Sequence, residues 1–208
     1  MQVKTGITVA PRKVDYLDKT IQSVPITLGD ITYFCEPGSG LKPSYNTIVH
    51  QSKLGCLHNW DFAARYLLNL NSDFVCILQY DIEFSHHSII NSLEPNPNAG
   101  FYSLYTPIFY RKKVKKIGWT NFNNGWNSVG ACALLFPQRS LFLLLEDPQY
   151  QDHLCNYEKN EQVDAIVCDV FKRLGLPTYY HNPSLCNHIG EVSTLNHRIM
   201  PEITNQLT

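Results

Sequence analysis

An uninterrupted apolar run, Phe74–Leu78, places the strongest constraint on how this chain folds. A strand with one face in water alternates apolar and polar residues, and this run shows no such alternation. The run is therefore typical of a strand that is buried on both faces. A strand of that kind predicts a sheet that lies inside the protein, with apolar cover on each side.

Short strand-like runs alternate along the chain with segments of helical periodicity. The strand-like runs are Gly6–Ala10, Ile31–Cys35, Phe74–Leu78, Phe101–Tyr110 and Ala131–Phe136. Apolar residues recur at helical spacing over 15–24, 57–68 and 163–174, where Asp15 is placed to cap the first helix and Gly175 to end the third. The alternation predicts an α/β protein with a Rossmann-like open, mostly parallel sheet and flanking helices.

Composition limits the classes of partner. The chain has 208 residues, of which 44% are hydrophobic, and this fits one domain with an ordinary core. Its 17 Lys and Arg against 18 Asp and Glu give a formal charge of -1, so we expect no nucleic-acid partner. The seven cysteines contain no C-x-x-C pair, which predicts reduced thiols and a cytoplasmic location. The longest apolar stretches, Ala131–Phe136 and Leu141–Leu145, are too short to cross a bilayer.

A basic run, Arg111–Lys116, holds five of the 17 basic residues. Such a run suits peripheral contact with an anionic membrane surface, an acidic glycan or nucleic acid. It also suits a solvated edge whose charges discourage unwanted strand pairing. The sequence leaves both interpretations open.

The residues that follow the predicted strands are candidates for a binding site, because open α/β sheets bind ligands beyond the carboxyl ends of their strands. Pro11 and Arg12 follow the first strand, Glu36 follows the second, and Tyr80 and Asp81 come after the apolar run. An acidic side chain at the mouth of a buried strand is costly without a partner, and a divalent cation is one such partner. An ordinary capping or solvent-facing aspartate is the alternative.

The common nucleotide and hydrolase motifs are absent from the sequence. No G-x-G-x-x-G follows a strand, and there is no G-x-x-x-x-G-K-[ST] phosphate loop and no G-x-S-x-G elbow. These absences argue against a Rossmann dehydrogenase, a P-loop enzyme and an α/β-hydrolase. A nucleotide bound by this chain would be held by a metal ion and side chains.

Five segments in order along the chain carry a family resemblance. They are Thr8–Arg12 with Tyr16–Ile21, Gly55–Leu68, Ile77–Phe84, Gly125–Phe136, and Asp164–Leu176 with Pro183–Gly190. This ordered set resembles the GT-A fold glycosyltransferases, which use nucleotide sugars as donors. The third segment is similar to the acidic D-x-D segment of the family, with Gln79 in place of the first acid. The small size is most similar to viral, phage or bacterial surface-glycan transferases.

The resemblance implies a metal-dependent enzyme with a UDP-sugar as donor and a glycan hydroxyl as acceptor. Asp81, which stands at the last acid of the D-x-D pattern, and His188 would hold Mn²⁺ or Mg²⁺, which neutralises the leaving diphosphate. For His188, a loop histidine bonded to the backbone is the alternative. The resemblance also implies contacts to the nucleotide from a set of strand-end and helix residues, namely Pro11, Arg12, Glu36, Asn59 and Tyr80.

A base is needed to take the proton from the acceptor hydroxyl. Asp164, at the start of the third predicted helix, is the first candidate and Glu161 the second. A base on the acceptor side implies single displacement with inversion. The alternative role for Asp164 is that it only complements the helix dipole. Trp119, Trp126 and Asn127 lie in an aromatic and amide-rich stretch that suits sugar binding, or else contains buried tryptophans in an irregular loop.

We therefore predict a single GT-A domain over residues 1–208, with a nucleotide-sugar half at about 1–100 and an acceptor-binding, catalytic half at about 101–208. The predicted function is a metal-dependent inverting glycosyltransferase, located in the cytoplasm, or in the host cytoplasm if the protein is viral. Two alternatives remain open. One is a catalytically weak or inactive GT-A-like protein that binds nucleotide or glycan, and the other is a nucleotidyltransferase.

Overall fold

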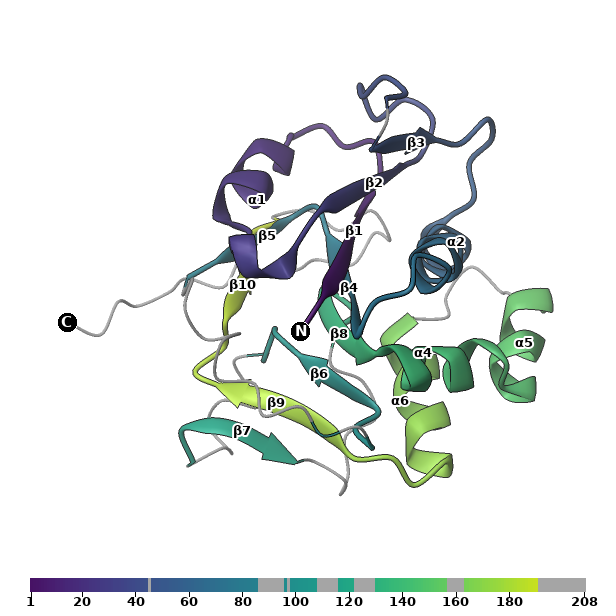
Figure 1. Cartoon of the computed structure of the whole chain (residues 1–208). Helices are drawn as coiled ribbons and strands as arrows, with labels where there is room; N and C mark the ends of the chain where they lie inside the picture. Colours follow the sequence, from purple (N-terminus) through teal and green to yellow (C-terminus); the bar gives the residue numbers. More distant parts are fainter. Residues whose placement is uncertain are drawn as a thin grey trace.

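The structure, a computed structural model, describes residues 1–44, 46–85, 96, 98–107, 116–121, 130–156 and 163–190 (Figure 1). In chain order its elements are β1 (Val3–Val9), α1 (Leu17–Ser23), the 3₁₀ helix η1 (Ile26–Leu28), β2 (Ile31–Cys35), β3 (Thr47–Val49), α2 (Cys56–Leu68), β4 (Phe74–Gln79), β5 (Ile82–Phe84), β6 (Phe101–Ser103), β7 (Gly118–Asn121), β8 (Ala133–Pro137), α4 (Gln138–Leu145), α5 (Pro148–Cys155), α6 (Val163–Arg173), β9 (Thr178–Asn182) and β10 (Cys186–His188).

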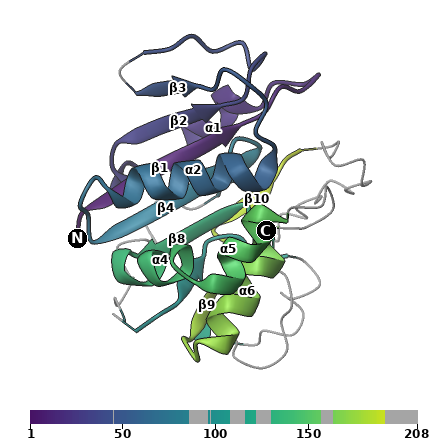
Figure 2. The same cartoon turned by 90° about the vertical axis from the view of Figure 1, so that its right-hand side faces the viewer.

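The described residues form an α/β protein with an eight-stranded mixed, mostly parallel open sheet. The strand order is β3-β2-β1-β4-β8-β6-β9-β7, and β5 and β10 form a separate antiparallel ribbon. The pairs β1–β2, β1–β4, β2–β3 and β6–β9 are parallel, whereas β8 is antiparallel to both of its neighbours and β7 to β9. Figure 2 shows α2 and α4 in front of the sheet and α1 behind it. The predicted α/β class with an open, mostly parallel sheet is confirmed.

Strand β4 is buried on both faces, as the apolar run predicted. Val75 and Ile77 belong to a core cluster that includes side chains of α2, α4 and α6. Cys76 and Leu78 belong to a second cluster, which includes Leu17 of α1. Each fully buried aliphatic side chain contributes about 1.5–3 kcal/mol, so the two clusters hold β4 firmly in the middle of the sheet.

The neighbouring strands β1 and β4 create a switch in strand order. From β1 the chain moves outward through β2 and β3, and it then returns to place β4 on the other side of β1. Their carboxyl ends therefore diverge at the point where α/β sheets most often bind ligands. Arg12 follows β1 and Asp81 follows β4, so the topology brings both residues to this point.

Several element boundaries differ from the sequence predictions. Strand β6 ends at Ser103, well before the predicted end, and α4 and α5 were not predicted. The N-cap residue of α1 is Tyr16, and the prediction of Asp15 at this position was wrong. Asp15 Oδ1 nevertheless accepts a hydrogen bond from Leu17 N at 2.9 Å. Gly175 does end α6 as predicted, with a φ of 66° and an amide that bonds to Lys172 O. None of the described helices is long and apolar enough to span a bilayer.

Candidate functional site

An ion pair joins the carboxyl ends of β1 and β4. Arg12 Nη1 lies 2.7 Å from Asp81 Oδ2, and the Asp81 side chain is 0% exposed whereas the Arg12 side chain is 13% exposed. The guanidinium also lies over the ring of Tyr80, with its central carbon 5.0 Å from the ring centroid. Three residues that the sequence assigned to a nucleotide site are therefore in contact with one another.

His188 reaches the same carboxylate from the far end of the chain. The antiparallel ribbon pairs His188 of β10 with Ile82 of β5, one residue after Asp81. His188 Nε2 lies 3.0 Å from Asp81 Oδ2, and Ile189 N donates to Asp81 O at 2.8 Å. The structure thus brings together the two residues that the sequence named as metal ligands.

Glycine at position 190 permits the backbone to close over this ion pair. A Cβ atom at Gly190 would overlap Asp81 Oδ2 and would lie 2.7 Å from Arg12 Nη1. Real Cβ contacts at such distances are essentially never seen. Residues 188–190 therefore form one wall of the Asp81 site, and this wall has no room for a side chain at position 190.

The surroundings of Asp81 keep it ionised. Burial alone would raise the pKa of Asp81, but the hydrogen bond and charge of His188, with the charge of Arg12, outweigh burial and hold that pKa below the ordinary 3.8. Oδ2 faces both Arg12 and His188. Oδ1 is buried and, outside its own residue, has no hydrogen-bond partner within the described ranges. A buried carboxylate oxygen left in this state favours an additional cationic or hydrogen-bonding ligand.

The Asp81 and His188 pair fits a divalent cation that is completed by ligand oxygens. Carboxylate oxygen and imidazole nitrogen together suit Mn²⁺, and the two atoms here already lie 3.0 Å apart and face each other. No group of three or more His, Cys, Asp or Glu side chains that could hold a metal occurs in the described part of the chain. Among the described residues, Asp81 and His188 would therefore be the two ligands, and diphosphate or water oxygens could supply others.

Glu36 and Asn59 hold the start of α2 in place. The Glu36 carboxylate is buried and accepts hydrogen bonds from Leu54 N at 2.9 Å and Gly55 N at 2.8 Å, directly before the helix. Asn59 donates to Phe34 O of β2 at 3.2 Å, and its Oδ1 lies 2.9 Å from His50 Nε2. Both residues were predicted to contact the nucleotide, and the structure shows them bonded within the protein.

Cys56, the first residue of α2, lies where the candidate residues meet. Burial raises the pKa of this thiol, and the charges of Asp164, Asp81, Arg12 and Glu36 all act on it. The residue as a whole is exposed. Cys56 was not among the residues predicted from the sequence to belong to the site. The available signal was Gly55, a residue without a side chain just before a predicted helix.

Asp164 lies in the first turn of α6 and is 6% exposed. Its Oδ2 accepts a hydrogen bond from Gly130 N at 2.6 Å, at a glycine with a φ of 76°. This bond links α6 to the segment that leads into β8. The charges of Asp164 and Asp81 are both among the causes that raise the pKa of the Cys56 thiol. The second candidate base, Glu161, lies outside the described residues.

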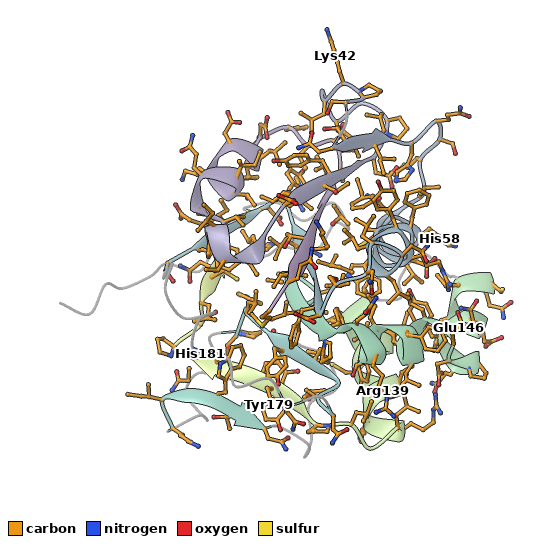
Figure 3. All side chains as sticks on the ribbon, in the orientation of Figure 1. Lys42, His58, Arg139, Glu146, Tyr179 and His181 are labelled. Atoms are coloured by element: carbon orange, nitrogen blue, oxygen red, sulfur yellow. The ribbon has the colours of Figure 1, made fainter. Side chains whose placement is uncertain are left out.

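Trp119 lies in a separate part of the fold. It is in β7, at the edge of the sheet and four strands away from β4, which corresponds to about 19 Å at the usual strand spacing. Its ring packs edge-on against Tyr102 and His181. Figure 3 shows His181 and Tyr179 on β9, the strand next to β7. Trp119 thus belongs to an aromatic cluster, and the structure does not bring it together with Asp81.

The remaining candidate positions lie largely outside the described residues. Trp126 and Asn127 belong to the range 122–129, and the first five residues of the basic run belong to the range 108–115. Lys116 is exposed, and its carbonyl accepts a hydrogen bond from Asn182 Nδ2 at 3.2 Å. Acceptor binding and membrane contact by these segments stay predictions.

The chain matches no model of a known protein family, and no curated protein sequence matches it at a significant level.

Proposed function

We propose that this chain is a GT-A type glycosyltransferase that moves a sugar from a UDP-sugar to a glycan hydroxyl with inversion. The observation that carries the proposal is the Arg12–Asp81–His188 cluster at the β1/β4 switch in strand order. A buried carboxylate, an imidazole and a guanidinium at this position suit the binding of a nucleoside diphosphate with a cation. The ordered segments that resemble the GT-A family, which include these three residues, support the same function.

Each residue of the cluster has a role in the proposed reaction. Asp81 and His188 would hold Mn²⁺ or Mg²⁺, a Lewis acid that stabilises the negative charge of the leaving UDP. Arg12 adds a fixed positive charge for the diphosphate, and the face of Tyr80 supports its guanidinium. Glu36 fixes the start of α2, which keeps Cys56 at the edge of the donor site.

Asp164 is the proposed base. Its Oδ2 is anchored by Gly130 N, so the carboxylate has a fixed orientation at the start of α6. In the proposed step it accepts the proton of the acceptor hydroxyl while the hydroxyl oxygen bonds to the anomeric carbon. The bond from that carbon to the UDP oxygen breaks, and UDP leaves with the bonding electrons. One displacement inverts the anomeric centre.

Thermal unfolding in the presence of nucleotide sugars tests the proposal directly. A ligand that binds only the folded state at a concentration 100 times its Kd stabilises it by about 2.7 kcal/mol. For a chain of this size, that corresponds to a rise in Tm of about 5–10 °C. We expect such a rise with a UDP-sugar and Mn²⁺, and a much smaller one in EDTA. An unchanged Tm across a panel of UDP-sugars with Mn²⁺ would contradict the proposal.

Cys56 offers a second readout of donor binding. Cys56 and Cys155 are the two exposed thiols in the described part of the chain. A UDP-sugar with Mn²⁺ at ten times its Kd should slow alkylation of Cys56 by maleimide about tenfold, because only the free protein reacts. Cys155, at the end of α5, should react at its original rate.

Mass mapping of the alkylated peptides identifies which thiol reacts, and Cys56→Ser confirms the assignment. Equal alkylation rates for Cys56 with and without saturating donor would place the donor elsewhere.

A protein that binds the donor without transferring sugar is the second candidate. The observation that favours it is Gln79, the last residue of β4, which stands where the family has an acid. A rise in Tm with UDP-sugar but no release of UDP, with or without acceptors, would support this candidate over the enzyme.

A further inference from the structure

Arg12 occupies the position next to Asp81 where a metal ion is proposed to bind. The Arg12 Nη1 and His188 Nε2 atoms both approach the same oxygen, Asp81 Oδ2, at 2.7 Å and 3.0 Å. Because the Asp81 side chain is 0% exposed, water does not hydrate its charge. Protein groups therefore compensate the carboxylate, with the guanidinium as the permanent positive charge.

The space around Asp81 Oδ2 is nearly full. The backbone at Gly190 approaches both Asp81 Oδ2 and Arg12 Nη1 so closely that not even a Cβ atom would fit there. A cation held by Asp81 Oδ2 and His188 Nε2 would compete with the guanidinium for the same oxygen, because two positive charges close to one carboxylate oxygen repel each other.

Arg12 is the more accessible member of the ion pair. It belongs to the loop that follows β1, and its side chain is 13% exposed, whereas that of Asp81 is not exposed at all. The ring of Tyr80 lies under the guanidinium. Its charge also acts on the solvent-exposed Cys56. An arginine displaced toward that side would present a planar donor pair, which suits two oxygens of a diphosphate.

We propose that Arg12 is a built-in counter-ion that exchanges with the divalent cation: the cation takes Asp81, and the released guanidinium binds the donor diphosphate. This inference rests on the proposed function for the identity of the diphosphate, but the exchange itself concerns only the cation. The exchange makes cation binding and diphosphate binding cooperative. The cation frees Arg12 for the diphosphate, and the diphosphate compensates the charge of the displaced Arg12. The protein then binds free metal weakly and binds metal with diphosphate tightly.

The direct test measures Mn²⁺ binding to the nucleotide-free protein by electron paramagnetic resonance, which detects free Mn²⁺. Arg12→Met keeps the length of the side chain and removes its charge, so we expect Mn²⁺ to bind about tenfold more tightly than to the wild type. Lys4→Met removes the cation of the exposed Lys4–Asp30 pair and should leave Mn²⁺ affinity unchanged. Adding His188→Ala to Arg12→Met should remove the gain, which assigns it to this site. Unchanged or weaker Mn²⁺ binding by a folded Arg12→Met protein would overturn the proposal.

A second measurement uses the wild-type protein and does not depend on any variant folding. Phenylglyoxal modifies accessible arginines, and mass mapping gives the rate at Arg12. Saturating Mn²⁺ should raise this rate several-fold, and UDP added with Mn²⁺ should lower it again. If saturating Mn²⁺ leaves the rate unchanged, Arg12 does not exchange with the cation.

The outcomes separate this inference from the proposed function. Mn²⁺ that exposes Arg12, with no protection by UDP, would support the exchange and argue against a UDP-sugar donor. UDP that binds with equal affinity to the wild type and Arg12→Met, under saturating Mn²⁺, would refute the diphosphate role of Arg12. Donor binding that needs Mn²⁺ but leaves Arg12 labelling unchanged would keep the proposed function and reject the exchange.

Discussion

Asp164→Asn is expected to lower kcat for sugar transfer by about 10²-fold or more, the usual scale of general-base catalysis. The asparagine oxygen can still accept the hydrogen bond from Gly130 N, so the side chain should keep its position while losing its basicity. Donor affinity, measured by calorimetry with Mn²⁺, should stay near that of the wild type. A loss in kcat without a loss in donor affinity identifies an interaction made in the transition state.

The matched control lies on the same helix. Asp169 of α6 is exposed, so Asp169→Asn changes the same charge without touching the proposed site and should leave kcat unchanged. If Asp164 serves only the helix dipole, Asp164→Asn should cost about 0.3–1 kcal/mol of stability with near-normal turnover. Normal turnover by Asp164→Asn together with inactive Glu161→Gln would move the base to Glu161. Retention at the anomeric carbon would reject single displacement by either acid.

Asp81→Ala is expected to lower the free energy of unfolding by about 3 kcal/mol and to abolish UDP binding that depends on Mn²⁺. Removing one member of a buried ion pair leaves the charge of its partner uncompensated, which typically costs about 3–5 kcal/mol. Because the Arg12 side chain is partly exposed, the expected cost of Asp81→Ala lies at the lower end of this range. Urea unfolding followed by circular dichroism measures the stability change, and calorimetry measures UDP binding.

The exposed pair Lys4–Asp30 provides the comparison for stability. Its atoms are 3.1 Å apart, much as in the buried pair, but the Asp30 side chain is 91% exposed. Asp30→Ala should therefore cost less than about 1 kcal/mol. An equal cost for the two variants would show that burial adds nothing to the Asp81 pair.

The stability difference between the wild type and Asp81→Ala should also depend on pH. The pKa of Asp81 is lower in the folded protein than its ordinary value of 3.8, so the unfolded state binds the proton more readily. The stabilisation by the Asp81 charge is therefore fully present well above pH 3.8, and it is lost as the pH falls through the folded-state pKa. The free energies of unfolding of the wild type and of Asp81→Ala should therefore approach each other as the pH is lowered.

The sequence was most informative where residues act over short distances. The run Phe74–Leu78 predicted a strand buried on both faces, and β4 is such a strand. Asp81 could be selected because the residue after a buried strand must lie at the edge of the sheet. Helix α4 was missed because it begins directly after β8, and two of its apolar residues, Phe142 and Leu143, are exposed and blur the helical pattern.

The partners of the site residues could not be predicted from the sequence. The resemblance named Asp81 and His188 together, but the contact of Arg12 with Asp81 follows from the register of β1 with β4. Likewise, the sequence does not show that the side chains of Glu36 and Asn59 form hydrogen bonds to the backbone before α2 and in β2. Those bonds depend on how the elements pack together. Trp119 was grouped with acceptor residues by composition, whereas sheet order places it four strands from β4.

The ribbon of β5 and β10 has a consequence for how the protein is made. On the ribosome, β1 and β4 emerge with Arg12 and Asp81 long before β10 is synthesised. Until then the carboxylate has its arginine but lacks the His188 imidazole and the wall at Gly190. A chain truncated before Cys186 thus contains all eight strands of the large sheet but only one of the two proposed cation ligands. The proposed cation site is therefore complete only after residue 190 has been synthesised.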